Sequence, residues 1–501
     1  MAAAASSPQS RLLRLLSLLA ITALVVADGG DGGRRVVRNG VAVISLAELD
    51  AWGAARKNPS NSKRAEMLGE QKKSNKPAGT TSTLVLELKH HSLTTVLDEP
   101  AARDRYLRRL LAADEARAAS LQQPRSNRAS TTQSSSRNDA AAEVPLTSGI
   151  GFQTLNYVTT ITLGGGISTN NNLTVIVDTG SDLTWVQCKP CSSCYPQRDP
   201  LFDPAGSPTY AAVPCNASAC AASLKAATGT PGSCASTSTS TSTSTSKRCY
   251  YALGYGDGSS SRGVLATDTV GLGRARLDGF VFGCGLSNRG LFGGTAGLMG
   301  LGRTELSLVS QTRPTYGGAF SYCLPATTST SSVGSLSLGG VDTSSSSSFH
   351  NTTPVAYTRM IADPAQPPFY FLNVTGASVA GAQLSASGLG AANVLIDSGT
   401  VITRLAPSVY RAVRDEFARQ FAAEAGHNYR TAPGFSILDT CYDLTGRDEM
   451  KVPLLTLRLE GGAEVTVDPA GMLFVVKKDG SQVCLAMASL PYEDQTPIIG
   501  N

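Results

Sequence analysis

The sequence predicts a mainly β protein that folds into two similar lobes. The 501 residues include 50 Gly and 25 Pro, which favours a turn-rich β chain over a helical one. An internal repeat predicts the two lobes, because residues 175–180 (VIVDTG) recur as residues 394–399 (VLIDSG). About 100 to 120 residues after each copy come two apolar residues and a glycine, at 298–300 and 498–500. Each half therefore presents one aspartate at the end of an apolar strand.

The chain begins with a predicted signal peptide over residues 1–27. Arg11 and Arg14 precede an apolar stretch at 15–26, and the small residue Ala27 comes before a polar run. A plastid transit peptide is the alternative, since the first 14 residues carry Arg and Ser but no acidic residue. No stretch reaches the roughly 18 apolar residues of a membrane span. The sequence therefore predicts export without a transmembrane segment.

Residues 28–145 have the character of a prosegment and linker. Residues 83–89 alternate apolar and polar residues as a half-buried strand does. Residues 103–121 follow a charged helical pattern, and residues 122–142 form a Ser-, Asn- and Arg-rich linker suited to proteolysis.

Charge is unequally divided along the chain. Residues 1–145 hold 21 Lys and Arg against 14 Asp and Glu, whereas residues 146–501 hold 22 against 24. The basic character belongs to the front segment, so the later region gives no signal for nucleic acid as a partner.

Eleven cysteines occur, all from Cys188 onward, and the odd number leaves one without a partner within the chain. The spacing of Cys188, Cys191 and Cys194 resembles a zinc or iron–sulfur motif. No histidine lies nearby and no fourth Cys-Pro follows, so we expect disulfides that pin an insert, and no metal. The candidates are Cys188, Cys191, Cys194, Cys215, Cys220, Cys234 and Cys249. Potential N-glycosylation sites are Asn172, Asn216, Asn351 and Asn373.

Strands dominate the remaining pattern. Residues 155–163 are a β-branched run that predicts a strand. Two low-complexity stretches, 233–246 and 327–348, lack apolar residues to pack and are predicted to be surface loops. One helix is predicted to begin at Pro407, whose fixed φ suits a first helical position. Its apolar stripe consists of Val409, Val413, Phe417 and Phe421.

The two repeated aspartates, Asp178 and Asp397, are the candidate catalytic residues. One Asp-Thr-Gly alone indicates only an aspartate in a turn, but two copies on matching strands suggest a pair. Two buried carboxylates that face each other cannot both ionise freely, so they share a proton. The ionised partner can then deprotonate a water while the protonated partner donates to a carbonyl oxygen, with no metal or cofactor. Gly180 and Gly399 allow close backbone packing.

Hydroxyl side chains follow both aspartates. We expect Thr179 and Ser398 to hydrogen-bond across the pair, and Ser181 and Thr400 to support the outer carboxylate oxygens.

These motifs together resemble the pepsin-like aspartic proteases, in which a proton-sharing aspartate pair is known. In order, they are residues 178–185 (DTGSDLTW), 255–259 (YGDGS), 297–302 (GLMGLG), 397–400 (DSGT) and 497–501 (PIIGN). The sequence Asp-Leu-Thr-Trp, the cysteine-rich insert 188–220 and residues 320–324 (FSYCL) are similar to the plant nepenthesin-like branch. The resemblance covers residues 150–501, and the strand at 84–90 resembles the family's prosegment.

The resemblance implies a bilobal pepsin-like fold with a peptide-binding cleft between lobes at 146–340 and 341–501. It implies an aspartic endopeptidase made as a zymogen, monomeric, acting on polypeptides and located in the cell wall or vacuole. The basic prosegment is expected to cover an acidic cleft as an intramolecular inhibitor and to leave on acidification. The resemblance also favours a disulfide between Cys441 and Cys484.

The resemblance further implies a flap formed by Tyr255, Gly256 and Asp257, with Trp185 hydrogen-bonded to the flap tyrosine. Asp-Gly is independently a good hairpin turn. Ordinary aromatic core is the alternative for Trp185 and Tyr255.

Two other functions were weighed. A serine or metallo-hydrolase is disfavoured, because only His350 and His427 follow the prosegment and neither His-Glu-x-x-His nor Gly-x-Ser-x-Gly occurs. A non-catalytic binding or inhibitor protein on the same fold is the alternative, but such proteins generally lack an intact aspartate pair. The chain ends at Asn501, where family members continue for several strands and one more Cys. We therefore expect an incomplete C-terminal lobe, and an inactive truncated isoform is a further alternative.

Overall fold

The computed structural model describes most of the chain after the predicted linker and parts of the segment before it. The described residues are 37–38, 40–45, 100–122, 142–148, 154, 156–164, 172–235, 247–255, 257–324, 334–339, 356–390, 393–424, 429–477 and 479–500. Several predicted features lie outside these residues: the signal peptide, the strand at 83–89, nearly all of the linker, Gly256, His350, His427, Asn351 and Asn501.

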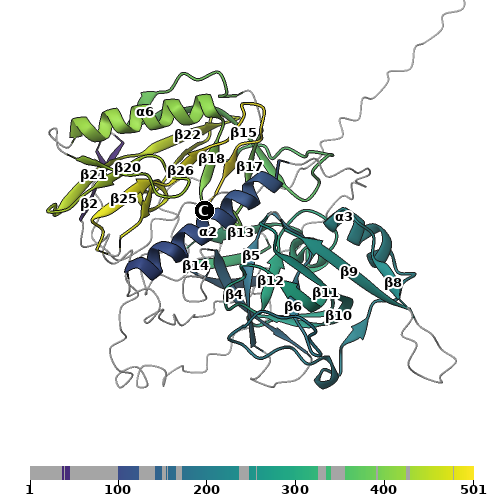
Figure 1. Cartoon of the computed structure of the whole chain (residues 1–501). Coiled ribbons are helices and arrows are strands. Elements are labelled where there is room, and N and C mark those ends of the chain that lie inside the picture. The colour runs from purple at the N-terminus through teal and green to yellow at the C-terminus, as the bar shows by residue number, and fades with distance from the viewer. Residues whose placement is uncertain are drawn as a thin grey trace, which may run out of the picture.

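Two β-rich lobes lie on either side of one long helix, α2 (Pro100–Ser120), as Figure 1 shows. The N-terminal lobe is built on a 12-stranded sheet with the order β13-β14-β3-β4-β5-β12-β6-β11-β10-β9-β8, and β7 pairs with β10. Its strands are β3 Ala142–Ser148, β4 Tyr157–Leu163, β5 Asn172–Asp178, β6 Trp185–Gln187, β7 Ala211–Ala212, β8 Ser233–Ala235, β9 Arg248–Gly254, β10 Ser260–Leu272, β11 Ala275–Arg289, β12 Gly297–Gly300, β13 Phe320–Cys323 and β14 Gly334–Leu338.

The C-terminal lobe contains an 8-stranded sheet with the order β23-β22-β15-β17-β27-β18-β26, in which β16 pairs with β15. These strands are β15 Tyr370–Val379, β16 Ala382–Gln383, β17 Asn393–Ile396, β18 Thr403–Leu405, β22 Leu455–Leu459, β23 Glu464–Thr466, β26 Met487–Ser489 and β27 Ile498–Ile499. A 4-stranded sheet, β19-β20-β25-β24, consists of β19 Arg430–Ala432, β20 Cys441–Asp443, β25 Gln482–Leu485 and β24 Leu473–Val475.

Helices are few in the described residues of both lobes. They are α3 Leu224–Thr228, α4 Leu308–Gln311, α5 Arg313–Tyr316, α6 Pro407–Glu424 and α7 Pro469–Met472, with a 3₁₀ turn at Pro204–Gly206 and a π turn at Ala219–Ser223. No helix in the described part of the chain is both long and apolar enough to cross a membrane. The prediction of a mainly β, bilobal fold is confirmed.

The internal repeat corresponds to the same strand arrangement in each lobe. In the N-terminal lobe β5 lies between antiparallel β4 and parallel β12. In the C-terminal lobe β17 lies between antiparallel β15 and parallel β27. Strands β12 and β27 carry the apolar residues that were recognised after each copy of the repeat, and each pairs directly with a strand that leads to an aspartate. The β-branched runs of β5 and β17 suit such central strands, which are buried on both faces.

The predicted helix at Pro407 is confirmed as α6, which covers one side of the C-terminal lobe (Figure 1). Its four stripe residues are at most 6% exposed, and the rings of Phe417 and Phe421 stack at 5.3 Å. Phe421 also contacts Tyr442 of β20, at a ring distance of 4.5 Å. This apolar face is therefore core.

Two loop predictions were partly wrong. Residues 334–338, inside the predicted loop 327–348, form β14 between β13 and β3. Leu336 and Leu338 are fully buried there, because the alternation of Leu with Ser and Gly is enough for a half-buried strand. Residues 233–235, at the start of the other stretch, form β8 against β9.

Disulfides pin the cysteine-rich insert, as predicted. Five bridges use ten of the eleven cysteines: Cys188–Cys284, Cys191–Cys194, Cys215–Cys234, Cys220–Cys249 and Cys441–Cys484. The pairing of Cys441 with Cys484 agrees with the resemblance, while Cys284 was missed as a partner because it lies 96 residues from Cys188.

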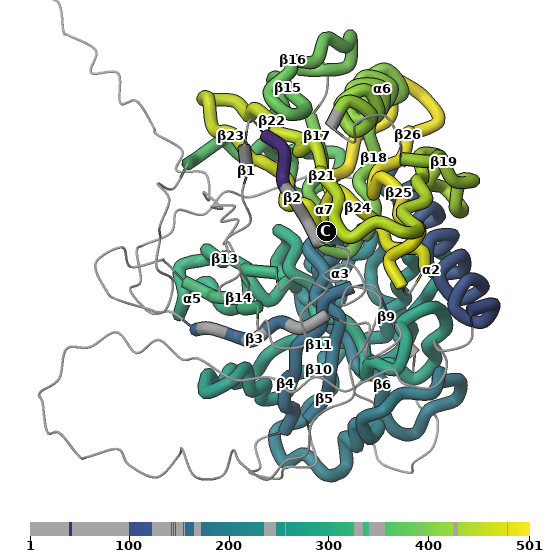
Figure 2. Tube along the Cα trace, turned by 90° about the vertical axis from the view of Figure 1, so that its left-hand side faces the viewer, coloured from purple at the N-terminus to yellow at the C-terminus, as the bar shows by residue number. Residues whose placement is uncertain are grey.

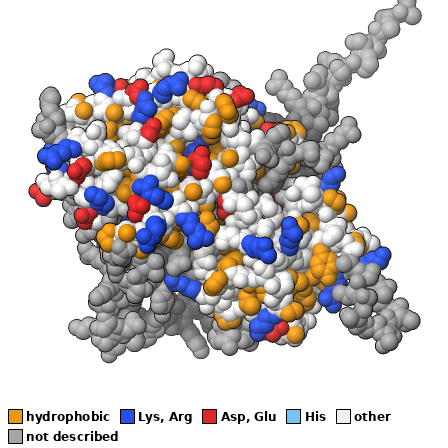
Figure 3. All heavy atoms as spheres, viewed as in Figure 1, with side chains coloured by type: hydrophobic (Ala, Val, Ile, Leu, Met, Phe, Trp, Pro, Cys, Tyr) orange, Lys and Arg blue, Asp and Glu red, His pale blue; other side chains and the backbone are white. Residues whose placement is uncertain are grey.

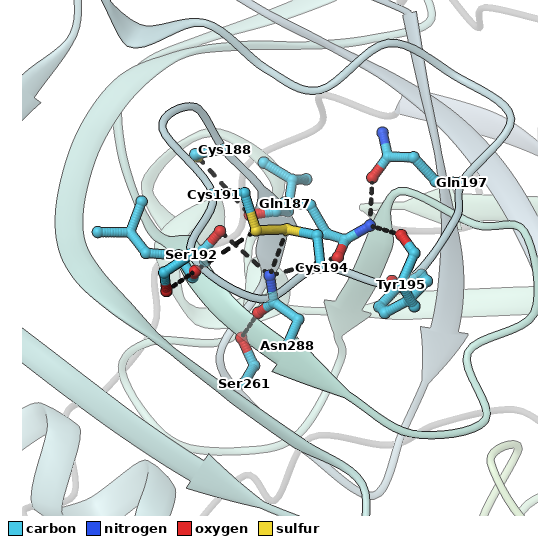
Figure 4. Close-up of a disulfide and its surroundings, with 12 residues drawn as sticks. Gln187, Cys188, Cys191, Ser192, Cys194, Tyr195, Gln197, Ser261 and Asn288 are labelled. Carbon is cyan, nitrogen blue, oxygen red and sulfur yellow. Dashed lines mark hydrogen bonds between the residues drawn. A yellow bond between two sulfur atoms is a disulfide. The ribbon is translucent and has the colours of Figure 1, made fainter.

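Beneath the Cys191–Cys194 bridge, Figure 4 shows a buried polar network. Asn288 accepts from Ser261 at 2.7 Å and donates to the carbonyl of Gly285 at 3.1 Å. Asn288 also donates to Cys194 Sγ at 3.6 Å, and Ser192 donates to the carbonyl of Leu286 at 2.8 Å, so these two contacts attach the insert to β11.

The predicted prosegment also contributes strands to the C-terminal lobe. Strands β1 (Val37–Arg38) and β2 (Val41–Ser45) form a 3-stranded sheet with β21 (Glu449–Pro453), and Figure 2 shows β2 beside β21. Ala42 of β2 is fully buried in the core of this lobe. The sequence analysis did not anticipate these strands.

Candidate active site

Asp178 and Asp397 meet where the two lobes face each other. Asp178 is the last residue of β5, Asp397 directly follows β17, and both are at most 1% exposed. A methyl group added at Gly180 would meet Asp397 Oδ1, and one added at Gly399 would meet Asp178 Oδ1. Each glycine therefore makes room for the carboxylate of the opposite lobe.

Reciprocal hydrogen bonds join the loops that carry the two aspartates. The amide of Thr179 donates to Ser398 Oγ at 3.2 Å, and the amide of Ser398 donates to Thr179 Oγ1 at 2.9 Å. This bridge between the lobes was expected from the sequence.

The outer carboxylate oxygens accept from the two predicted hydroxyl groups, and the inner oxygens accept from backbone amides. Ser181 donates to Asp178 Oδ2 at 2.5 Å, and Thr400 donates to Asp397 Oδ2 at 2.6 Å. The amides of Gly180 and Gly399 each donate at 3.0 Å to the Oδ1 atom of their own aspartate. The two carboxylates thus have equivalent surroundings.

Arg117 of α2 lies between the two carboxylates. Its Nη2 donates to Asp178 Oδ1 at 2.7 Å and to Asp397 Oδ1 at 3.1 Å, while its Nε donates to Asp397 Oδ2 at 3.0 Å. A guanidinium suits this position because its donors are fixed in a planar fork. One cation therefore occupies the space that both inner oxygens face.

The protonation of the pair follows from burial and charge. Burial raises the pKa of Asp178 above its ordinary value, Arg117 opposes this shift, and the neighbouring Asp397 adds to it. Burial lowers the pKa of Arg117, but the charges of both aspartates outweigh this effect and the net shift is upward. Arg117 is therefore a permanent cation at this site.

A second ion pair holds α2 against the C-terminal lobe one helical turn from Arg117. Asp114 Oδ1 accepts from the amide of Val401 at 2.6 Å, and its Oδ2 accepts from the amide of Ile402 at 3.2 Å. Arg404 of β18 donates to Asp114 Oδ2 at 2.9 Å, and both side chains are almost fully buried. Burial raises the pKa of Asp114, while Arg404 and the two amides act against this shift.

Basic side chains are numerous on the exposed side of α2. Arg105, Arg108 and Arg109 are exposed, and Figure 3 shows Lys and Arg gathered over this part of the molecular face with a few acidic groups between them. The basic character of the front segment is thus present where α2 crosses between the lobes.

A β-hairpin from the N-terminal lobe lies beside the aspartates, formed by β9 and β10 and turned at Tyr255–Ser259. Gly258 has a φ of +81°, as the Asp-Gly turn predicts. Trp185 Nε1 donates to Tyr255 Oη at 2.8 Å, so this predicted hydrogen bond is confirmed. Phe292 packs edge-on against both rings, at 4.9 Å from Trp185 and 5.7 Å from Tyr255.

A cavity lies between α2 and the hairpin, beside Asp178. Its lining combines groups from the helix, the hairpin turn and both lobes: Leu110, Ala113, Asp114, Arg117, Thr154, Asn156, Ile176, Asp178, Tyr255, Asp257, Leu291, Phe292, Leu298, Gly399 and Val401.

The structure therefore brings the predicted catalytic, supporting and hairpin residues together, apart from Gly256. Sequence reasoning missed Arg117, Asp114 and Arg404. A signal for the first two was available, since Asp114 and Arg117 lie three apart in a predicted helix of a basic segment. That spacing alone does not reveal a partner.

The three glycosylation candidates among the described residues differ in exposure. Asn172 and Asn216 are exposed, whereas Asn373 is half-buried and donates to Glu460 at 3.4 Å. Their modification stays a prediction.

Comparison with known proteins gives consistent matches. The family model described as "Xylanase inhibitor N-terminal" matches residues 157–340, and "Xylanase inhibitor C-terminal" matches residues 369–501. An aspartyl protease family protein of Arabidopsis thaliana is 38% identical over 85% of this chain and 84% of its own length. Aspartic proteinase nepenthesin-1 of Nepenthes gracilis is 34% identical over 63% of this chain and 66% of its own length.

Among solved structures, basic 7S globulin from soybean superposes with a TM-score of 0.53 at 19% identity, covering 73% of this chain and 91% of that protein. This likeness supports the fold alone. The family models together span more than half of the chain, and the Arabidopsis protein matches most of its length. The chain therefore belongs to the pepsin-like aspartyl protease family of plants, which includes nepenthesin-1.

Proposed function

We propose that the protein is an aspartic endopeptidase made as a zymogen, with Asp178 and Asp397 as its catalytic pair. The observation that carries this proposal is the position of Arg117 Nη2, within 3.1 Å of the inner oxygens of both aspartates. A water molecule in that position could hydrogen-bond to both carboxylates. The same contact explains why the precursor would be inactive.

The proposed reaction needs only water and the shared proton. After α2 leaves, the ionised carboxylate takes a proton from the bound water, whose oxygen attacks the carbonyl carbon of the peptide. The protonated carboxyl donates to the carbonyl oxygen, giving a neutral tetrahedral diol. Collapse of this intermediate breaks the C–N bond as a proton reaches the leaving nitrogen. Because the two carboxylates share one proton, they act as a pair and not as two separate groups.

The hairpin supports this function by covering the reacting atoms. Burial raises the pKa of Tyr255 well above its ordinary value, so its hydroxyl stays protonated at any pH at which the pair works. The hydrogen bond from Trp185 fixes the tyrosine ring over the cavity. Closure of the hairpin over a peptide would exclude water from the reaction.

The test is cleavage of an acid-denatured protein by the secreted full chain at pH about 3 to 5, with pepstatin as inhibitor. We expect Asp178→Asn and Asp397→Asn each to lower the rate by about 10² to 10⁴-fold, since each removes a group that transfers a proton. Both substitutions preserve side-chain volume. Equal cleavage by the wild type and both variants would sink the assignment.

A non-catalytic binding protein is the second candidate, favoured by the xylanase inhibitor names of both matching family models. The same assay separates the two. A binding protein would be folded and secreted but would show no Asp178-dependent cleavage.

A further inference from the structure

Arg404 is a buried cation whose acidic partners, among the described residues, both come from α2. It is 1% exposed, and its Nη2 lies 2.9 Å from Asp114 Oδ2 and 3.2 Å from Glu115 Oε2. Its Nε and Nη1 have no hydrogen-bond partner in the described part of the chain. Departure of α2 would leave this guanidinium without a counter-charge. A buried, unpaired cation is costly, so the site favours another anion.

The surrounding donors are arranged for one carboxylate. The amides of Val401 and Ile402 donate to the two oxygens of Asp114, and Arg404 adds a charged donor to one of them. Three donors from β18 and the segment before it thus converge on a single carboxylate. We call these three groups the Arg404 site.

The Arg404 site lies close to the catalytic pair along the direction of α2. Asp114 and Arg117 are three residues apart, which in an α-helix corresponds to a rise of about 4.5 Å. An extended peptide advances about 3.3 Å per residue, so this offset corresponds to one or two residues from the bond that faces the aspartates.

We propose that the Arg404 site is an acidic subsite of the mature enzyme, which binds an Asp or Glu side chain of the substrate one or two residues from the cleaved bond. Asp114 of the precursor occupies this subsite in place of the substrate carboxylate. The inference rests on the proposed peptidase function. It adds a specificity-determining residue, Arg404, to that function.

The experiment uses the full chain after acid activation and pairs of fluorogenic peptides that differ only in Asp or Asn. The Asp/Asn pair is moved through the three positions on each side of the cleaved bond. We expect kcat/KM to favour Asp about 10- to 100-fold at one position next to or one removed from the bond, as a charge-assisted hydrogen bond would give.

Three variants separate a subsite from a purely structural role. Arg404→Gln should bring the Asp/Asn ratio at that position to about one, while Arg404→Lys should retain part of it. The control is Arg411→Gln on α6, an exposed arginine of the same lobe that pairs with Glu493. It should leave both the ratio and the rate unchanged.

The possible results separate failure of the acidic subsite from failure of the proposed peptidase function. Asp178-dependent cleavage with no Asp preference at any position in the wild type would overturn the acidic subsite alone. An Asp preference that persists in Arg404→Gln would do the same. If Arg404→Gln is not secreted, the wild-type Asp/Asn ratio and the ratio measured with Arg404→Lys decide. Absence of Asp178-dependent cleavage of every peptide would overturn the proposed function, and the subsite with it.

Discussion

Arg117 is the residue on which the charge balance of the aspartate pair depends. Its guanidinium contacts both carboxylates through Nη2 and Nε, and its side chain is only 15% exposed. A charge in this position satisfies two buried carboxylates that would otherwise repel each other. The same geometry excludes a water from the inner oxygens.

At this scale we predict that Arg117→Gln weakens inhibition in the unprocessed precursor. Glutamine keeps some hydrogen bonding but loses the charge, so α2 should hold the aspartates less tightly. We expect the intact precursor to cleave a small peptide at least about tenfold faster than the wild-type precursor, as loss of a charged hydrogen bond implies. The measurement is initial velocity before any change in chain length on a gel.

Arg109→Gln provides the matched control, because Arg109 is an exposed arginine of the same helix. Its precursor should stay as inactive as the wild type. Equal activity of the Arg117 and Arg109 variants would contradict the role assigned to Arg117.

At the scale of elements, α2 contacts both lobes through side chains of one helical turn. Arg117 reaches the aspartate pair, and Asp114 reaches Arg404 and the amides of Val401 and Ile402. Leu107 and Leu111 bury the apolar side of the helix in a cluster of the C-terminal lobe. The helix therefore combines an apolar anchor with two ion pairs that depend on pH.

The two ion pairs respond to acid with opposite sign. Burial raises the pKa of Asp178, and the charge of Arg117 acts against this shift, so Asp178 with α2 docked binds fewer protons than the same group without the cation. Docking through Arg117 therefore weakens as the pH falls and Asp178 is protonated. Burial raises the pKa of Asp114, so its carboxyl group binds a proton more tightly in the docked helix than in a free helix. Acid therefore favours docking of α2 through Asp114.

We therefore predict that the Asp114→Ala precursor releases α2 and is processed at a higher pH than the wild type. The substitution removes both the acid-strengthened contribution and the counter-charge of buried Arg404. Processing is followed by chain length after steps from pH 7 down to pH 3. Glu115→Gln serves as control, because Glu115 is the half-exposed partner of the same arginine. Identical midpoints for all three chains would refute the prediction.

At the scale of the whole molecule, the front segment is attached to the rest of the chain at two distant places. Helix α2 lies between the lobes, while β2 pairs with β21 in the C-terminal lobe (Figure 2). The segment thus takes part in the core of a lobe as well as in covering the aspartates.

We predict that Ala42→Asp impairs folding of the precursor. Ala42 is fully buried in the apolar core of the C-terminal lobe. A carboxylate at this position would have neither water nor a charged partner. We expect a loss of several kcal/mol in stability, seen as a lower Tm and reduced secretion. Ala211→Asp on exposed β7 is the control and should be neutral. A normal Tm for Ala42→Asp would show that β2 does not contribute to the folded lobe.

The sequence by itself determined the mainly β fold, the two-lobe repeat, the helix at Pro407 and the residues around Asp178 and Asp397. These features depend on local pattern: apolar strands that end in Asp-Thr-Gly or Asp-Ser-Gly, and an apolar stripe with helical spacing. The hydrogen bonds of Ser181 and Thr400 could be predicted for the same reason, because each hydroxyl lies three residues after its aspartate.

Only the tertiary structure decided which distant groups meet. Arg117 lies 61 residues from Asp178 and 280 from Asp397, and Asp114 lies 290 from Arg404. Charged residues in a helical pattern look alike in sequence whether they face solvent or a buried carboxylate, because the pattern fixes the face of the helix and not its partner. The same holds for Cys188 and Cys284 and for β2 on β21, whose pairing depends on how the chain packs in three dimensions.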